Sequence, residues 1–198
     1  MKKHAPATLR NREVILAVLR DELPTTGSVL EIAAGSGEHA VFFASALPHL
    51  KWVPSDPAPE AIASIAAYRQ DVGLPNLEPP VALDASAADW PVHQANALVC
   101  INMVHISPWE ATEGLFRGAA RVLNDNDAPL ILYGPYFETG VEPAQSNVQF
   151  DESLRARDPR WGIRSLEEVD ALGQRHGFVR AARYEMPANN LTMVYRSA

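Results

Sequence analysis

The sequence predicts an α/β fold: a doubly wound, mostly parallel, Rossmann-like sheet of seven strands, with helices on both faces and an antiparallel strand at its C-terminal end. Two observations predict it. Short apolar runs alternate with segments of helical periodicity along most of the 198 residues. The last two apolar runs are joined by four residues only, which is too short for a crossover helix. The length suits one domain over residues 1–198.

Helical spacing of apolar residues places the helices. Val14, Ile15, Val18 and Leu19 share one face of a helix over 10–22, and Pro24 ends it. We expect residues 1–24 to form an N-terminal helical cap. Further helices are predicted over 36–47, 60–71, 109–123 and 165–177.

Apolar runs bounded by Gly, Pro or Asp place the strands. They cover 28–34, 51–56, 79–86, 95–104 and 129–134, and two more lie within 177–197, joined by Pro187-Ala188-Asn189-Asn190. Residues 135–164 form a long polar segment. Loops of this length are commonly lids or binding loops, so we expect a lid or substrate loop here.

The composition excludes some classes of protein. The formal net charge is −7, which argues against a nucleic-acid partner, because such proteins usually present a basic surface. No apolar stretch approaches the length of a membrane span, and we expect a cytoplasmic protein without a membrane partner. The single cysteine, Cys100, lies in the apolar run ALVCINMV, which predicts a buried structural thiol.

Polar and glycine residues follow the predicted strands, at the edge where such sheets bind ligands. Gly35 and Gly37 follow the first strand and allow close approach of a ligand to the backbone. Asp56 lies about 20 residues further on, where a carboxylate can accept hydrogen bonds from both ribose hydroxyls; it could equally cap the next helix. Asp84 ends the third strand and Asn102 the fourth.

Two ligands fit a glycine turn followed by an acid. Gly35-Ser-Gly37-Glu-His-Ala40 matches GxGxxA, the fingerprint of dinucleotide-binding proteins, and a nicotinamide-dependent oxidoreductase is one reading. That reading leaves Glu31 unexplained. A buried carboxylate is costly unless it is paired or hydrogen-bonded, so Glu31 is expected either to organise the site or to face a cationic ligand.

The chain resembles the class I S-adenosylmethionine-dependent methyltransferases and, more closely, the methyltransferase-like 26 family, along nearly its full length. The stretches that carry the resemblance are RNRE, LEIAAGSGEHA, SDP, INMVHISPW, YGPY, SNVQFDESLRARDPRWGIR and MPANNL. The resemblance implies S-adenosylmethionine as cofactor. The chain departs from the usual acid-x-Gly-x-Gly-x-Gly pattern at Ala33, which an extended backbone would tolerate, and at Glu38.

The resemblance also implies roles for individual residues. Glu31, Gly35, Ser36 and Gly37 would surround the methionine portion, and Asp56 would hold the ribose. Asp84 and Ala85 would border the adenine, and Asn102 and Met103 would line the floor of the site. On the first helix, Arg12 could pair with the cofactor carboxylate or be a surface charge.

Methyl transfer needs an acceptor held in line and, for a hydroxyl or protonated amine, a base. His105 follows the fourth strand and is a candidate base, or else a histidine bonded within its loop. Tyr136 could orient the acceptor or contact the sulfonium, and core packing is equally compatible with it. Candidate substrate contacts are Trp161, Arg164, Asn189 and Asn190, although the asparagines also suit a tight turn.

The leading hypothesis is therefore a methyltransferase acting on a small molecule, with an oxygen acceptor preferred because of His105. No metal is expected, since Asn102 stands where metal-dependent relatives carry acids. The Asn-Pro-Pro-Tyr motif of enzymes that methylate nucleic-acid bases is absent. The alternatives are the oxidoreductase and a non-catalytic binding protein that keeps the methyltransferase fold.

Overall fold

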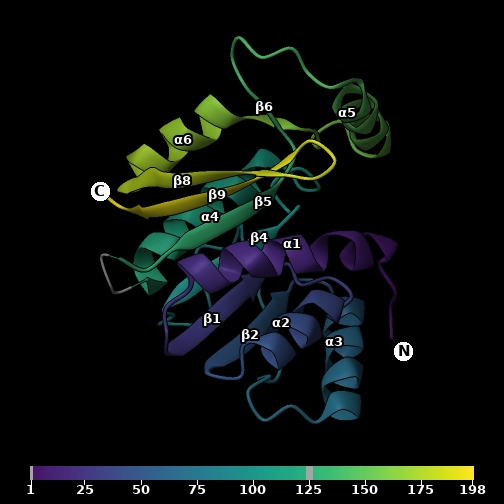
Figure 1. Ribbon diagram of the computed structural model, residues 1–198, viewed down its shortest axis with the longest axis vertical. Coiled ribbons are helices and arrows are strands. Elements are labelled where there is room, and N and C mark those ends of the chain that lie inside the picture. The colour runs from purple at the N-terminus through teal and green to yellow at the C-terminus, as the bar shows by residue number, and fades with distance from the viewer. Residues whose placement is uncertain (1, 124–126) are drawn as a thin grey trace.

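A seven-stranded sheet with the strand order β3-β2-β1-β4-β5-β9-β8 forms the centre of the protein (Figure 1). The structure, a computed structural model, describes residues 2–123 and 127–198. The strands of this sheet are β1 Gly27–Ile32, β2 Leu50–Asp56, β3 Val81–Ala82, β4 Ala97–Ile101, β5 Leu130–Gly134, β8 Phe178–Met186 and β9 Asn190–Ser197.

The first five strands run parallel, so their carboxyl ends meet at one edge. Strand β9 lies antiparallel between β5 and β8, with Tyr133 opposite Thr192. The predicted sheet of seven strands and its antiparallel C-terminal strand are thus confirmed. The order reverses between β1 and β4, which is the place where doubly wound sheets bind ligands.

Helices cover both faces of the sheet (Figure 1). On one face α1, Pro6–Glu22, and α2, Glu38–Ala46, pack through Leu16, Leu19 and Phe43. On the other face lie α4, Trp109–Val122, and α6, Leu166–Arg175. Helix α3, Pro59–Val72, packs against α2 and β2. Helix α1 begins four residues earlier than the apolar pattern predicts, because Pro6 suits the first turn of a helix, where its missing N–H is no loss.

Residues 135–164 are more ordered than a loop. They contain β6, Tyr136–Phe137, and α5, Gln145–Arg157, and they end at β7, Arg164–Ser165, which pairs with β6. Helix α5 carries no apolar stripe, since its buried residues are only Asn147 and Leu154, so its sequence has no periodicity to detect. Asn147 Nδ2 donates to the carbonyl oxygen of Asn189 at 3.0 Å, which holds α5 beside the β8–β9 turn (Figure 1).

Two expectations drawn from composition can be compared with the structure. Cys100 is buried in β4, as predicted, and burial raises the pKa of its thiol to about 12. Within residues 2–123 and 127–198, no helix has both the length and the apolar character that crossing a membrane requires.

Gly114 of α4 is a packing constraint beside the carboxyl edge of the sheet. A Cβ at this position would overlap the carbonyl oxygen of Ala85. We expect Gly114→Ala to lower the midpoint of thermal unfolding, although alanine favours a helix by about 1 kcal/mol relative to glycine. The control is Ala120→Gly, at an exposed position of the same helix. It should lower the free energy of unfolding only by this difference in helix propensity. A stabilised Gly114→Ala protein would contradict the packing described.

Candidate functional site

The loop of residues 33–37 joins β1 to α2 at the carboxyl edge of the sheet. Gly35 and Gly37 both have positive φ, 59° and 90°. A Cβ on Gly37 would lie 3.0 Å from the Cα of Ile65, so glycine lets the loop pack tightly on α3. A Cβ on Gly35 would meet no atom within 4 Å. The loop is therefore closely packed on one side and open at Gly35.

Ala33 corrects an expectation drawn from the sequence. Its φ is 56°, in the left-handed region, and not the extended conformation that would make alanine harmless there. A side chain in this region costs about 1–2 kcal/mol. Neighbouring bonds hold the backbone in place: the Ala34 N–H donates to the carbonyl oxygen of Ser55 at 2.8 Å, and Gly37 donates to Ala34 at 3.0 Å.

Asp56 connects the loop to the end of β2. Its Oδ2 accepts a hydrogen bond from the Gly35 N–H at 3.0 Å, and its Oδ1 accepts one from the Ala58 N–H at 2.9 Å. Ala58 is the N-cap residue of α3 and, among the described residues, the helix has no side-chain cap hydrogen bond, so Asp56 forms a turn before the helix and does not cap it. A carboxylate offers about four acceptor positions, so two remain for a ligand.

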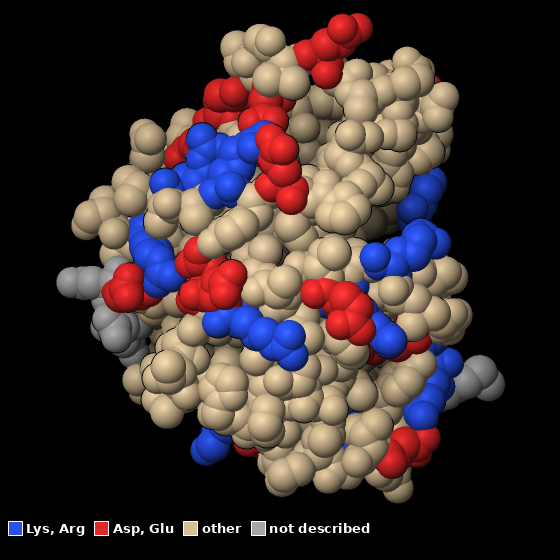
Figure 2. All heavy atoms as spheres, viewed as in Figure 1, with Lys and Arg blue, Asp and Glu red and all other residues tan. Residues whose placement is uncertain are grey.

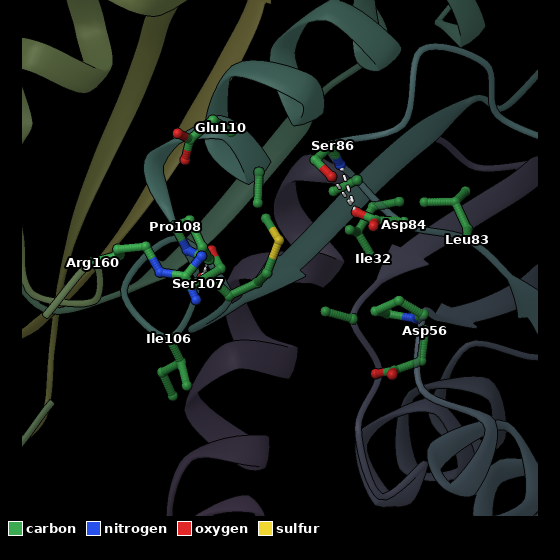
Figure 3. A pocket seen from close by; sticks show the side chains of 15 residues that line it. Ile32, Asp56, Leu83, Asp84, Ser86, Ile106, Ser107, Pro108, Glu110 and Arg160 are labelled. Atoms are coloured by element: carbon green, nitrogen blue, oxygen red, sulfur yellow. Dashed lines mark hydrogen bonds between the residues drawn. The ribbon is translucent and has the colours of Figure 1, made fainter. Parts of the chain in front are cut away.

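A hollow of about 520 Å³ opens where β1 to β4 end and α4 begins. We call it the nucleoside pocket, after the ribose and adenine that the sequence leads us to expect there. Its sides differ in charge: Asp56 and Asp84 lie on one side, and Arg160 and Glu110 on the other (Figure 3). Its lining is Ile32, Ala33, Asp56, Pro57, Leu83, Asp84, Ala85, Ser86, Met103, Ile106, Ser107, Pro108, Glu110, Ala111 and Arg160.

Asp84 is oriented within the nucleoside pocket by its neighbour. Its Oδ1 accepts hydrogen bonds from the Ser86 N–H at 2.8 Å and from the Ser86 hydroxyl at 2.7 Å (Figure 3). Its second oxygen has no such partner among the described residues. The pocket can thus offer an acceptor at each of two strand ends, and its lining includes the apolar side chains of Ile32 and Leu83. This arrangement suits a nucleoside, which presents hydroxyl and amine donors around a flat apolar ring.

The sequence left two roles open for Glu31, organising the site or facing a cationic ligand. Its contacts in the structure are those of an organising residue. It is 1% exposed, and its Oε2 accepts a hydrogen bond from Trp52 Nε1 at 2.6 Å. Burial raises the pKa of Glu31 to about 8. Its side chain does not line the nucleoside pocket; it alternates with Ile32, which does. The carboxyl group ties β1 to β2 behind the glycine loop.

A second hollow of about 520 Å³ lies between α1, α5 and the β8–β9 turn; we call it the chamber. It adjoins the nucleoside pocket at the turn after β4, since Asn102 lines the chamber and the next residue, Met103, lines the pocket. Asn102 has φ 63°, a conformation that asparagine tolerates better than most residues. The chamber is lined by Arg10, Asn11, Val14, Asn102, Tyr133, Pro135, Ser146, Asn147, Phe150, Pro187, Ala188 and Asn190.

His105 and Tyr136, the two candidate catalytic residues, contact each other in the core. Their ring centroids are 4.7 Å apart, and the His105 ring is completely buried. Burial, assisted by the charge of Arg164, lowers the pKa of His105 to about 3. Neither ring lines the nucleoside pocket or the chamber. The structure therefore does not bring His105 to a surface where it could meet an acceptor.

The remaining predicted residues are spread over the site. Arg12 lies over the ring of Phe42 at 4.5 Å and lines neither hollow. Arg164 holds the turn after β4, donating to the carbonyl oxygens of Val104 at 3.1 Å and Ser107 at 2.8 Å. Trp161 stacks with Arg157.

The two asparagines of the hairpin differ. Asn190 lines the chamber and also donates to its own turn, while Asn189 bonds Ser146 of α5. Sequence reasoning missed Arg10, Asn11 and Phe150. The (i, i+1, i+4) spacing of Arg10, Asn11 and Val14 could have shown their shared face, because the predicted helix over 10–22 already contains all three.

Comparison with solved structures shows which class of fold this is. The mitomycin 7-O-methyltransferase MmcR matches 97% of the chain with a TM-score of 0.81 at 16% identity. CalO1, a methyltransferase of calicheamicin biosynthesis in its SAH-bound form, matches 97% with a TM-score of 0.77 at 19% identity. The chain spans about half of these two proteins, 54% and 55%. The PH0226 protein of Pyrococcus horikoshii OT3 matches 98% of this chain and 93% of its own, with a TM-score of 0.75 at 14% identity.

The fold is thus the Rossmann-like fold of methyltransferases. A family model described as "Protein of unknown function (DUF938)" matches residues 2–197, and the chain belongs to this family.

The raised pKa of Glu31 gives a test of the buried carboxyl. Between its ordinary value of 4.5 and about 8, the unfolded chain loses a proton that the folded protein keeps, so the free energy of unfolding falls as pH rises. Glu31→Gln keeps an oxygen for Trp52 and cannot ionise. We expect it to remove this decline, which amounts to at most ~1.4 kcal/mol per pH unit.

Urea unfolding at several pH values between 5 and 8 measures the effect. Glu13→Gln, at an exposed position of α1, is the control and should follow the wild type. If the Glu31→Gln and wild-type proteins lose stability in parallel over this range, the assignment of a neutral Glu31 is wrong.

Proposed function

We propose that the protein is an S-adenosylmethionine-dependent methyltransferase acting on a small molecule. The observation that carries the proposal is the nucleoside pocket, with Asp56 and Asp84 at the carboxyl ends of β2 and β3 beside a glycine loop. The likeness to methyltransferases supports the fold on which this pocket lies. Membership of the methyltransferase-like 26 family and a cytoplasmic location remain part of the proposal.

The residues present fit the cofactor. The acceptors left on Asp56 suit the ribose hydroxyls, and the unpartnered oxygen of Asp84 suits the exocyclic amine of adenine. Leu83, Ala85 and Met103 supply apolar surface for the ring. Gly35, whose missing side chain leaves open space, would border the methionine portion together with Ser36 and Gly37. A volume of about 520 Å³ is within the usual range for small-molecule sites.

When bound, the cofactor supplies a methyl group on a positively charged sulfur, which a nucleophile can displace. The chain's own contribution is position: the Asp56 bonds fix the loop, and the turn after β4 fixes the boundary between the nucleoside pocket and the chamber. The small-molecule acceptor would occupy the chamber. A nucleic-acid acceptor is not proposed, in view of the net charge of −7.

Cofactor binding is the first test. Thermal unfolding with S-adenosylmethionine, S-adenosylhomocysteine or NADH, each at about 100 times its dissociation constant, would add roughly 2.7 kcal/mol for a true ligand. That raises the midpoint by about 5 °C or more in a domain of this size. We expect a rise with the two sulfur compounds and none with NADH. A rise with NADH alone would favour the oxidoreductase, and no rise with any ligand would favour a non-catalytic protein.

Asp84→Asn tests the placement of the adenine. Asparagine can keep the oxygen that Ser86 bonds while its NH₂ replaces the unpartnered oxygen, so an acceptor becomes a donor facing the amine. We expect affinity for S-adenosylhomocysteine to fall by about 1.5–3 kcal/mol in calorimetry. Asp21→Asn, the same change at an exposed position of α1, should bind as the wild type does. Equal affinities for all three proteins would show that the adenine lies elsewhere.

A further inference from the structure

The chamber differs from the nucleoside pocket in charge. Among the described residues that line it, none is Asp, Glu or His, and the single ionised side chain is Arg10. Polar contacts come from neutral groups, namely Asn11, Asn102, Ser146, Asn147 and Asn190. Apolar surface comes from Val14, Phe150 and two prolines. The face that carries α1 has acidic and basic side chains interspersed over it, and the surface is hollowed between α1 and α5 (Figure 2). The acidic groups of that face do not enter the chamber lining.

Arg10 is available for a ligand. Within residues 2–123 and 127–198 it has neither a hydrogen-bond nor an ion-pair partner, whereas Arg155, Arg160 and Arg183 are each paired with a carboxylate. A guanidinium group has five N–H donors and binds a carboxylate through two parallel hydrogen bonds. A cationic amine in the chamber would meet this charge without any carboxylate to offset it. The lining therefore selects for an anion.

The part of the chamber lining that the structure describes also contains no base. Among the described lining residues, the one group apart from Arg10 that can give up a proton is Tyr133, and burial raises the pKa of its hydroxyl. His39 lies behind Asn11, with Nε2 2.9 Å from Asn11 Oδ1, and does not line the chamber. His105 is buried against Tyr136. An acceptor that had to lose a proton during the reaction would find no group here to take it.

We propose that the chamber binds the methyl acceptor, and that this acceptor is an apolar small molecule bearing a carboxylate, held by Arg10; the proposal rests on the methyltransferase function above. A carboxylate is already ionised at neutral pH. One of its oxygen lone pairs forms the bond to the methyl carbon while the carbon–sulfur electron pair returns to sulfur. The negative and positive charges cancel, the products are a methyl ester and a thioether, and no proton is released.

Three matched probes test the proposal: 2-naphthoate, 2-naphthalenemethanol and 2-naphthylmethylamine, which share an apolar body and differ in charge. Their dissociation constants are measured by ligand-observed NMR on the full chain, with and without saturating S-adenosylhomocysteine. We expect the acid to bind about tenfold more tightly than the alcohol, as for one hydrogen-bonded charge pair, and the amine to bind most weakly.

Arg10→Gln should bring the acid to the affinity of the alcohol. The matched control is Arg20→Gln, an exposed arginine of the same helix outside the chamber, which should keep the preference. An acid preference that survives Arg10→Gln, a preference for the amine or alcohol, or no binding of any probe would overturn the proposal.

Failure of the underlying function gives a different result. In that case S-adenosylhomocysteine does not bind, while the acid still binds in an Arg10-dependent manner, and the chamber is an anion site of another kind of protein. This outcome overturns the acceptor role and identifies the methyltransferase step as the part that is wrong. Binding of S-adenosylhomocysteine without any acid preference overturns the acceptor class alone.

Discussion

The hydrogen bonds accepted by the Asp56 carboxylate hold together the parts from which the nucleoside pocket is built. One oxygen binds the glycine loop at Gly35, and the other binds the start of α3 at Ala58. The end of β2, the loop after β1 and the helix that supports the loop thereby become one unit. Ala33 keeps its unfavourable left-handed conformation because the loop is fixed on both sides. The Asp56 carboxylate would then have two roles, one structural and one in ligand binding. These two roles explain why an acid is needed at this strand end.

The turn after β4 separates two environments of opposite character. The described lining of the nucleoside pocket has three carboxylates and the guanidinium of Arg160, as suits a cationic cofactor, whereas that of the chamber has one guanidinium and no carboxylate. Arg164 and Gly162 fix this turn by bonding the carbonyl oxygens of Val104 and His105. The segment after α5 therefore holds this boundary, so the shape of both hollows depends on residues about 60 positions away in the chain.

The sequence was sufficient for the sheet and for half of the nucleoside pocket, because both follow from local patterns. The parallel sheet follows from the alternation of strands and helices, and Asp56 and Asp84 were found because they follow predicted strands. The order of the strands came from the structure. His105 could not be placed, since its burial depends on the long-range bonds of Arg164 and Gly162. Helix α5 was missed for the opposite reason: its packing uses few apolar residues, so no periodic signal exists to be recognised.

The position of β9 inside the sheet has a consequence for the order of assembly during synthesis. The residues lining the nucleoside pocket lie between positions 32 and 160, whereas the chamber also needs Pro187, Ala188 and Asn190 from the β8–β9 turn. Strand β8 joins the sheet only through β9, so neither can dock until residue 197 has left the ribosome. A growing chain thus completes the lining of the nucleoside pocket first, and the chamber is completed only after the β8–β9 turn has been made.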